Sequence, residues 1–189
     1  MRIGVLALQG DYEKHLDVLR RLGVEAVLVR TAEEVRALDG LIIPGGESST
    51  VGKLMRRYGI DKAIVERVNE GMAVFGTCTG LILMATEIEG SDQPRLGLLD
   101  ITVRRNAFGR QVDSFETDIG IPELGSEPLR AVFIRAPFVT EVRNGVKSLA
   151  YIDGRPVLAT RGKLLACAFH PELTDDTRLH QYFLKLVKD

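Results

Sequence analysis

The feature that most restricts how this chain folds is the pentapeptide at residues 76–80, Gly-Thr-Cys-Thr-Gly. One apolar run, residues 72–75, leads into it, and a second, residues 81–85, follows it. This arrangement predicts a strand, a sharp turn and a helix in immediate succession. The two glycines let the strand and helix backbones approach closely while the central residue takes a strained conformation. The pentapeptide has the form of a nucleophile elbow that carries cysteine where serine is more common.

Cys78 is expected at a helix N-terminus, where unpaired N–H groups and the helix dipole favour a thiolate. The alternative is an inert buried thiol, because free cysteines are often buried. The flanking glycines and the strand–helix context favour the nucleophile. The other cysteine, Cys167, lies in an apolar run of strand length and is expected in the core. Two cysteines do not suggest a disulfide framework, so a cytoplasmic location is expected.

Size and charge exclude several classes of protein. The chain has 189 residues, of which 45% are hydrophobic, and 25 basic residues offset 26 acidic ones. One sizeable core is expected, and residues 1–189 are interpreted as a single domain. A net charge of −1 creates no field that would attract nucleic acid or a membrane surface. The first apolar stretch is too short for a membrane-spanning helix or a signal peptide and reads as a strand.

Strands and helices alternate in the first half of the chain. Strands are expected at residues 2–8, 25–30, 41–43 and 72–75, and helices at 11–22, 49–57 and 61–70, with a capping box at Thr31–Glu34 opening another. After residue 95 short strands dominate, at 98–103, 131–134, 148–152, 156–159 and 164–169, before a closing helix at about 175–187. We therefore predict an α/β, three-layer sandwich with a mostly parallel central sheet and appended antiparallel strands.

Ligands collect at the carboxyl ends of the strands in such a sheet, which directs attention to the segments after each strand. His170-Pro171-Glu172 follows the last strand. A thiol nucleophile needs a base, and the base needs an acid that orients it, so His170 and Glu172 could serve Cys78. A packing pair without a catalytic role remains the alternative. The other histidines, His15 and His180, lie in helical patterns and are expected to face solvent or boundary positions.

The loop Gly45-Gly46-Glu47 follows the third strand. Its backbone could present N–H groups to an oxyanion, a carboxylate or a phosphate. Taken alone, it is equally well explained as a glycine-rich turn.

Several strings together carry a family resemblance. They are residues 6–10 (Leu-Ala-Leu-Gln-Gly), 44–50 (Pro-Gly-Gly-Glu-Ser-Ser-Thr), 76–80, 105–111 (Arg-Asn-Ala-Phe-Gly-Arg-Gln), 133–137 (Phe-Ile-Arg-Ala-Pro) and 169–172 (Phe-His-Pro-Glu). The chain resembles the class I, or triad, glutamine amidotransferases from its first strand to its last helix. Within that class it resembles the glutaminase subunits of pyridoxal 5′-phosphate synthase. Ile82, where many class members carry glutamine, agrees with this branch, whereas Thr79 stands where alanine is common.

The resemblance implies that L-glutamine is hydrolysed to glutamate and ammonia by Cys78, His170 and Glu172, without a metal or organic cofactor. It also implies a hetero-oligomer in which a synthase subunit receives the ammonia. The implied glutamine-binding residues are Gly46, Glu47, Ser48, Arg105, Ile134 and Arg135. The implied oxyanion donors are the backbone N–H groups of Gly46 and Thr79.

Charge-assisted donors suit the α-carboxylate of glutamine, which favours Arg105 and Arg135, although both could also be ordinary surface arginines. Two other classes of function remain. A DJ-1-like cysteine hydrolase is disfavoured by the His-x-Glu after the last strand. A silent regulatory module that binds glutamine is disfavoured by the intact triad.

Overall fold

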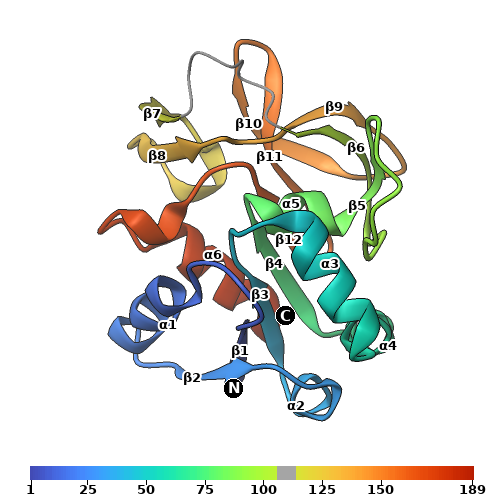
Figure 1. Ribbon diagram of the computed structural model, residues 1–189. Coiled ribbons are helices and arrows are strands. Elements are labelled where there is room, and N and C mark those ends of the chain that lie inside the picture. The colour runs from blue at the N-terminus through green and yellow to red at the C-terminus, as the bar shows by residue number, and fades with distance from the viewer. Residues whose placement is uncertain (106–113) are drawn as a thin grey trace.

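The computed structural model describes residues 1–105 and 114–189 (Figure 1). Part of one string that carries the resemblance, residues 106–111, therefore lies outside the described residues. Within the described part of the chain, a seven-stranded sheet has the order β10-β11-β12-β4-β3-β1-β2. Its strands are β1 (Arg2–Leu6), β2 (Glu25–Val29), β3 (Gly40–Ile43), β4 (Ala73–Thr77), β10 (Lys147–Ile152), β11 (Arg155–Arg161) and β12 (Leu164–Cys167).

The first-half strands and β12 are mutually parallel, and β11 and β10 continue the sheet in antiparallel fashion. Strands β3, β4 and β12 are buried along their whole lengths, as expected for strands covered on both faces. On one face of the sheet lie α1 (Tyr12–Arg21) and α6 (Arg178–Lys188) (Figure 1). On the other lie α3 (Ser48–Arg57), α4 (Ile60–Asn69) and α5 (Thr79–Met84). The predicted three-layer fold is confirmed.

A short helix, α2 (Ala32–Arg36), packs against α4. The Thr31 side chain accepts a hydrogen bond from the Glu34 backbone, and the Glu34 carboxylate accepts one from the Thr31 backbone. The capping box predicted from the sequence is thus present.

Further strands lie above the carboxyl ends of the parallel strands (Figure 1). One group is β5 (Ala85–Ile88), β6 (Leu99–Arg104) and β9 (Phe138–Val142), and the other is β7 (Ser114–Ile119) paired with β8 (Leu129–Ile134). The turns η1 (Pro122–Leu124) and η2 (Pro171–Leu173) are 3₁₀ helices. Strands β6 and β8 were predicted, whereas β5, β7 and β9 were not. In β7, Ser-Phe-Glu-Thr-Asp-Ile, four of the six residues are polar, so no apolar run marks the strand.

The predictions for His15 and His180 are wrong, since both side chains are fully buried. His15 precedes Val18 and Leu19 by three and four residues on α1, and His180 precedes Phe183 and Leu184 in the same way on α6. Residues so spaced share a helix face, and all four of these partners are buried. Assigning the histidines by polarity rather than by helical position caused the error.

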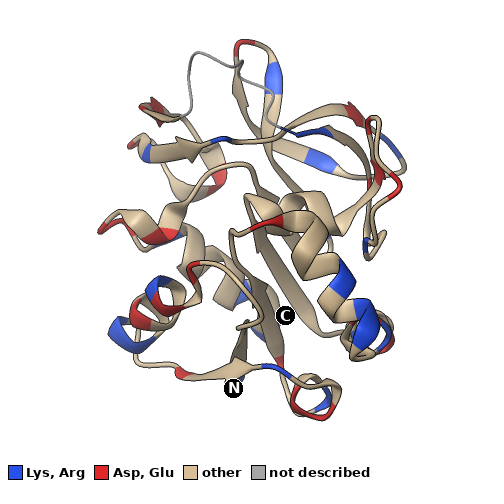
Figure 2. Ribbon diagram, in the orientation of Figure 1, with Lys and Arg blue, Asp and Glu red and all other residues tan. Residues whose placement is uncertain are grey.

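The surface agrees with the balanced composition. Basic and acidic residues are interspersed over the ribbon (Figure 2). Within the part of the chain that is described, no helix combines the length and hydrophobicity that a membrane crossing needs.

Candidate active site

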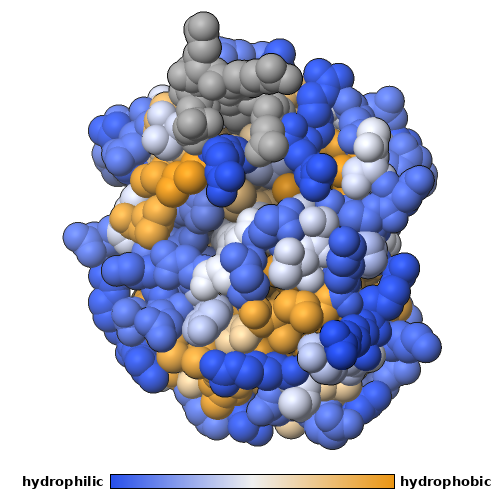
Figure 3. Space-filling view, in the orientation of Figure 1, coloured by the Kyte–Doolittle hydropathy of each residue, from blue (hydrophilic) through white to orange (hydrophobic). Residues whose placement is uncertain are grey.

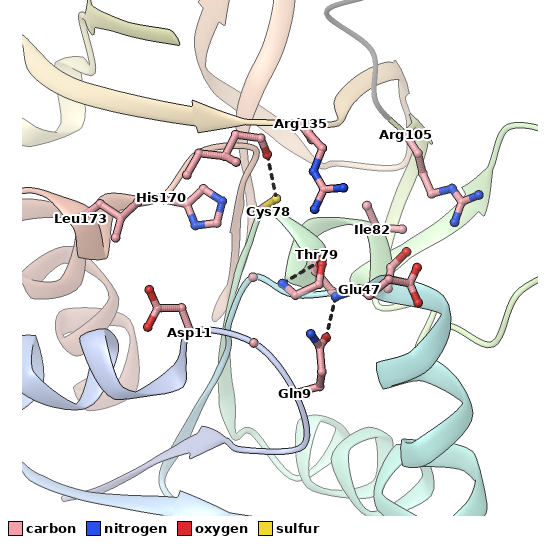
Figure 4. Close-up of a pocket in the computed structure, with 15 residues that line it drawn as sticks. Gln9, Asp11, Glu47, Cys78, Thr79, Ile82, Arg105, Arg135, His170 and Leu173 are labelled. Atoms are coloured by element: carbon pink, nitrogen blue, oxygen red, sulfur yellow. Dashed lines mark hydrogen bonds between the residues drawn. The ribbon is translucent and has the colours of Figure 1, made fainter. Parts of the chain in front are cut away.

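A cavity of about 490 Å³ opens where the carboxyl ends of the parallel strands meet the segments after β6 and β8 (Figure 4). It brings together residues from every loop that the sequence analysis singled out. The lining residues are Gln9, Gly10, Asp11, Gly45, Gly46, Glu47, Ser48, Cys78, Thr79, Ile82, Arg105, Ile134, Arg135, His170 and Leu173.

Cys78 occupies the turn between β4 and α5 with φ 49° and ψ −98°. This is a backbone conformation that side chains other than glycine rarely adopt, and it costs of order 1–3 kcal/mol. The flanking glycines permit it. A Cβ atom on Gly76 would lie 2.6 Å from the carbonyl carbon of Gly80, and one on Gly80 would lie 2.3 Å from the Ile43 carbonyl oxygen. The predicted strand–elbow–helix geometry is confirmed.

Cys167 supports the elbow through its backbone. Its carbonyl accepts a hydrogen bond of 2.8 Å from the Cys78 N–H. Its side chain is fully buried, and burial raises the pKa of the Cys167 thiol well above its ordinary value. The residue belongs to the core, as predicted.

His170 and Glu172 follow β12, which is the neighbour of β4 in the sheet. His170 Nδ1 lies 2.7 Å from Glu172 Oε1, and the Glu172 side chain has no exposed surface. The imidazole lies beside the Cys78 sulfur (Figure 4). A Cβ atom on Gly45 would lie 2.5 Å from the ring carbon Cε1, so glycine at position 45 leaves space for the imidazole. The three residues proposed as a triad are therefore neighbours.

Electrostatics favour a charged imidazole at this position. Burial opposes a charge on His170, but its interactions with Cys78 and Glu172 outweigh that effect and raise its pKa to about 10. Burial also disfavours ionisation of Glu172, but the imidazoles of His15 and His170 lower its pKa below the ordinary value. A cationic imidazole beside a sulfur stabilises the thiolate, which is the reactive form of a cysteine nucleophile.

The loops after β1 and β3 lie side by side. The Glu47 N–H donates a hydrogen bond of 2.6 Å to Gln9 Oε1, and a Cβ atom on Gly10 would lie 1.8 Å from the Gly45 carbonyl oxygen. Both backbone polar groups of Gly46 are bound to Thr79: the Gly46 N–H donates to Thr79 Oγ1 at 3.2 Å, and Thr79 Oγ1 donates to the Gly46 carbonyl at 2.5 Å. Figure 4 shows these contacts on the floor of the cavity.

Glu47 caps α3. Its carboxylate accepts hydrogen bonds from the backbone and the hydroxyl groups of Ser49 and Thr50, and these bonds lower its pKa to about 2. The carboxylate therefore stabilises the start of the helix.

Arg105 and Arg135 approach the cavity from the ends of β6 and β8 (Figure 4). Arg105 Nη1 donates a 2.9 Å hydrogen bond to Gln93 Oε1, which also accepts a 3.3 Å bond from Ser48 Oγ. Gln93 thus joins two residues implicated in substrate binding. Arg135 has φ 43°, and the carbonyl of Ile134 lies 3.9 Å from Cys78 Sγ.

Two supporting residues were missed by the sequence analysis. Gln93 is buried in a segment without regular structure, and no motif marks it. His15 Nε2 lies 3.3 Å from Glu172 Oε2, and only its helical position relative to Val18 and Leu19 could have indicated that it is buried.

The fold and this constellation are those of a three-layer α/β protein with a cysteine, a histidine and a glutamate gathered at the carboxyl ends of its parallel strands. The model of the SNO glutamine amidotransferase family matches residues 5–189, so the chain belongs to that family. It is 54% identical to pyridoxal 5′-phosphate synthase subunit PdxT of Carboxydothermus hydrogenoformans, covering 99% of this chain and 98% of that one. It is also 54% identical to the protein of the same name from Thermotoga petrophila, over the whole of both chains.

Solved structures of similar fold agree with this family assignment. A crystal structure described as a glutamine amidotransferase is 53% identical, with a TM-score of 0.94 over 99% of both chains. The structure of PurLQS from Thermotoga maritima has a TM-score of 0.72 over 97% of both chains. At 16% identity, that second likeness supports the fold alone.

Proposed function

We propose that this chain is a glutaminase that hydrolyses L-glutamine to L-glutamate and ammonia, with residues 1–189 acting as one amidotransferase domain. The observation that carries the proposal is the strained elbow at Cys78 beside the buried His170–Glu172 pair. Membership of the glutamine amidotransferase family supports the substrate.

The Cys78 thiolate attacks the side-chain amide carbon of glutamine, and the carbonyl oxygen becomes an oxyanion. The imidazolium of His170 gives its proton to the leaving nitrogen, which departs as ammonia and leaves a γ-glutamyl thioester. Neutral His170 then takes a proton from water as the water attacks the thioester, and glutamate and the Cys78 thiolate are released. Glu172 orients His170 and stabilises its charge throughout. His170 moves the proton of each half-reaction, and the carboxylic acid that forms loses its proton to ammonia or solvent to give glutamate.

Substrate recognition is assigned to the residues above and beside Cys78. Arg105 and Arg135 are the two arginines among the described residues of the cavity lining, and their guanidinium groups suit the α-carboxylate. Gly46, Glu47, Ser48 and Ile134 complete the substrate site, with the N–H groups of Gly46 and Thr79 as oxyanion donors.

The relatives named as subunits of pyridoxal 5′-phosphate synthase support a partner. We assign the chain to a cytoplasmic hetero-oligomer in which a synthase subunit receives the ammonia for vitamin B6 synthesis. Two hydrophobic residues of the cavity rim, Ile134 and Leu173, are each 38% exposed, and hydrophobic surface lies over β8 and η2 (Figure 3). Exposed apolar surface of this kind is available for contact with a partner protein.

In this structure the Gly46 N–H donates to Thr79 rather than to the cavity. Activation by the partner would consist of turning this peptide so that its N–H faces the oxyanion. One oxyanion donor is worth roughly a hundred- to thousandfold in rate.

The test is steady-state release of ammonia at saturating glutamine, by the chain alone and with the synthase subunit of a pyridoxal 5′-phosphate synthase. Strong stimulation on mixing is expected. The absence of glutamine hydrolysis with and without the subunit would overturn the proposed function. Full activity of the chain alone would overturn the activation step and leave the triad assignment in place.

A further inference from the structure

Two fully buried histidines extend from the acid of the triad into the core. His15 Nε2 lies 3.3 Å from Glu172 Oε2 and 3.1 Å from the hydroxyl oxygen of Thr77. His15 Nδ1 lies 3.0 Å from His180 Nε2. Glu172 Oε1, the other carboxylate oxygen, is held by His170. The side chains form a continuous series: His170, Glu172, His15 and His180.

The charge on Glu172 favours one arrangement of hydrogens along this series. A carboxylate oxygen 3.3 Å from His15 Nε2 repels a lone pair on that atom, so the favoured tautomer carries its hydrogen on Nε2, which is hydrogen-bonded to Thr77 Oγ1 and lies close to Glu172 Oε2. Burial lowers the pKa of His15, so the ring is neutral and its Nδ1 is an acceptor. His180 Nε2 must then donate to it. Burial also lowers the pKa of His180 to about 3, which leaves His180 Nδ1 unprotonated, and that atom has no hydrogen-bond partner among the described residues.

Glu172 needs this support because its second oxygen is otherwise isolated. Among the described residues no hydrogen-bond partner of Oε2 meets standard geometry, and the His15 ring is the polar group that approaches it. An unpaired buried charge is costly. His15 also contacts Thr77, the residue just before the nucleophile, and so it links the acid of the triad to the strand that carries Cys78.

We propose that His15, itself oriented by His180, is a positioning residue that keeps Glu172 ionised and aligned with His170. This inference rests on the proposed glutaminase function. His15 does not line the cavity, so it acts through Glu172 and not on the substrate.

Removal of the His15 donor raises the pKa of Glu172, because the carboxylate loses a group that favours its charged form. Since the catalytic form needs ionised Glu172, the acid limb of the kcat/KM profile moves to higher pH. The titratable or charged groups that face this series are Asp11, Arg21, Cys78, Cys167 and His170, and Lys14, Asp17 and Asp175 line the neighbouring surface groove.

The experiment compares His15→Leu with His15→Gln in the presence of the synthase subunit. Leucine fills a similar volume without a donor, whereas the amide nitrogen of glutamine can replace Nε2. For His15→Leu we expect kcat to fall roughly ten- to hundredfold, the acid limb to move up by about one pH unit, and KM to stay unchanged. His15→Gln should recover most of both losses. A folded His15→Leu variant with the wild-type kcat and pH profile would overturn the proposal.

A second measurement needs no variant. Nitrogen-15 NMR of the histidine side chains in the wild-type protein should show neutral His15 and neutral His180, each with its hydrogen on Nε2. A hydrogen on Nδ1 of neutral His15 would overturn the proposal, because that ring could not donate to Glu172. If wild-type protein with its partner released no ammonia, the proposed function would fail, while the NMR result would still test the hydrogen-bonded series.

Discussion

The proposed triad and the proposed oxyanion loop lie on two sides of the cavity that are held by different parts of the molecule. Cys78 and His170 follow β4 and β12, adjacent parallel strands whose last residues, Thr77 and Cys167, are in register. The three residues of the proposed triad are at most 8% exposed. On the side of the proposed oxyanion donors, Gly46 lies in a loop. Two hydrogen bonds to the Thr79 hydroxyl and one from the Glu47 N–H to Gln9 hold this loop.

This difference suits the packed side to the chemical reaction and the loop side to regulation of its rate. Groups fixed by a packed core stay in place at no further cost when substrate arrives, which is what a nucleophile and its base require. A glycine peptide held by one hydroxyl group can reorient, because glycine tolerates many backbone conformations. Regulation of the rate is therefore expected on the loop side, and substitutions on the two sides should differ in kind.

Substitution of the nucleophile should have the largest effect. Cys78→Ala removes the group that forms the thioester, so ammonia release should fall by at least about a thousandfold, with and without the synthase subunit. Glutamine binding, measured by calorimetry, should persist. Cys167→Ala is the matched control and should retain activity, because its thiol is buried in the core. Loss of activity in the control alone would reverse the assignment of the nucleophile.

The base and its orienting acid come next and should differ from each other. His170→Ala loses proton transfer in both half-reactions and should be nearly inactive. Glu172→Gln keeps a hydrogen-bonding side chain but loses the charge, so it should be impaired and still measurable. Single-turnover rates of ammonia release would rank the two variants. Small and equal effects would mean that the pair only contributes packing.

Much of this rigid side was predictable from sequence, because local patterns encode it. The apolar runs around residues 76–80 predict a strand and a helix, and the glycines predict their close approach. The position of His170 after a buried strand places it at the same edge of the sheet as Cys78. These features depend on residues that are close together in the chain.

The features that the sequence did not predict depend on contacts between distant segments of the chain. Gln93 joins Ser48 to Arg105, and His15 joins α1 to Glu172, across 157 positions of sequence numbering for the second pair. A polar residue in a helical pattern does not reveal whether another element covers it. Strand β7 escaped prediction for a related reason: its pairing with β8 stabilises a stretch in which four of six residues are polar.

The arginines should show a substrate-binding effect of intermediate size. Replacement of Arg105 or Arg135 by Met removes a charge-assisted hydrogen bond to the α-carboxylate of glutamine. Such bonds are worth about 1.5–3 kcal/mol, so KM should rise roughly tenfold or more while kcat changes less. Arg104→Met is a control, because Arg104 pairs with Glu89 outside the cavity. An unchanged KM in both cavity variants would contradict the assignment.

Thr79→Ala should have the smallest effect, and in the opposite direction. The Thr79 hydroxyl makes hydrogen bonds to both the N–H and the carbonyl of Gly46, and the first of these bonds holds the N–H away from the cavity. A hydrogen bond contributes about 0.5–1.5 kcal/mol, so its removal should raise the rate without the synthase subunit by up to about tenfold. The rate with the subunit should change little, since the peptide is already reoriented there. Thr79→Ser keeps the hydroxyl and should behave as wild type. If Thr79→Ala instead lowered the rate without the subunit while Thr79→Ser did not, the hydroxyl would support the active arrangement, and the loop side would be as fixed as the triad side.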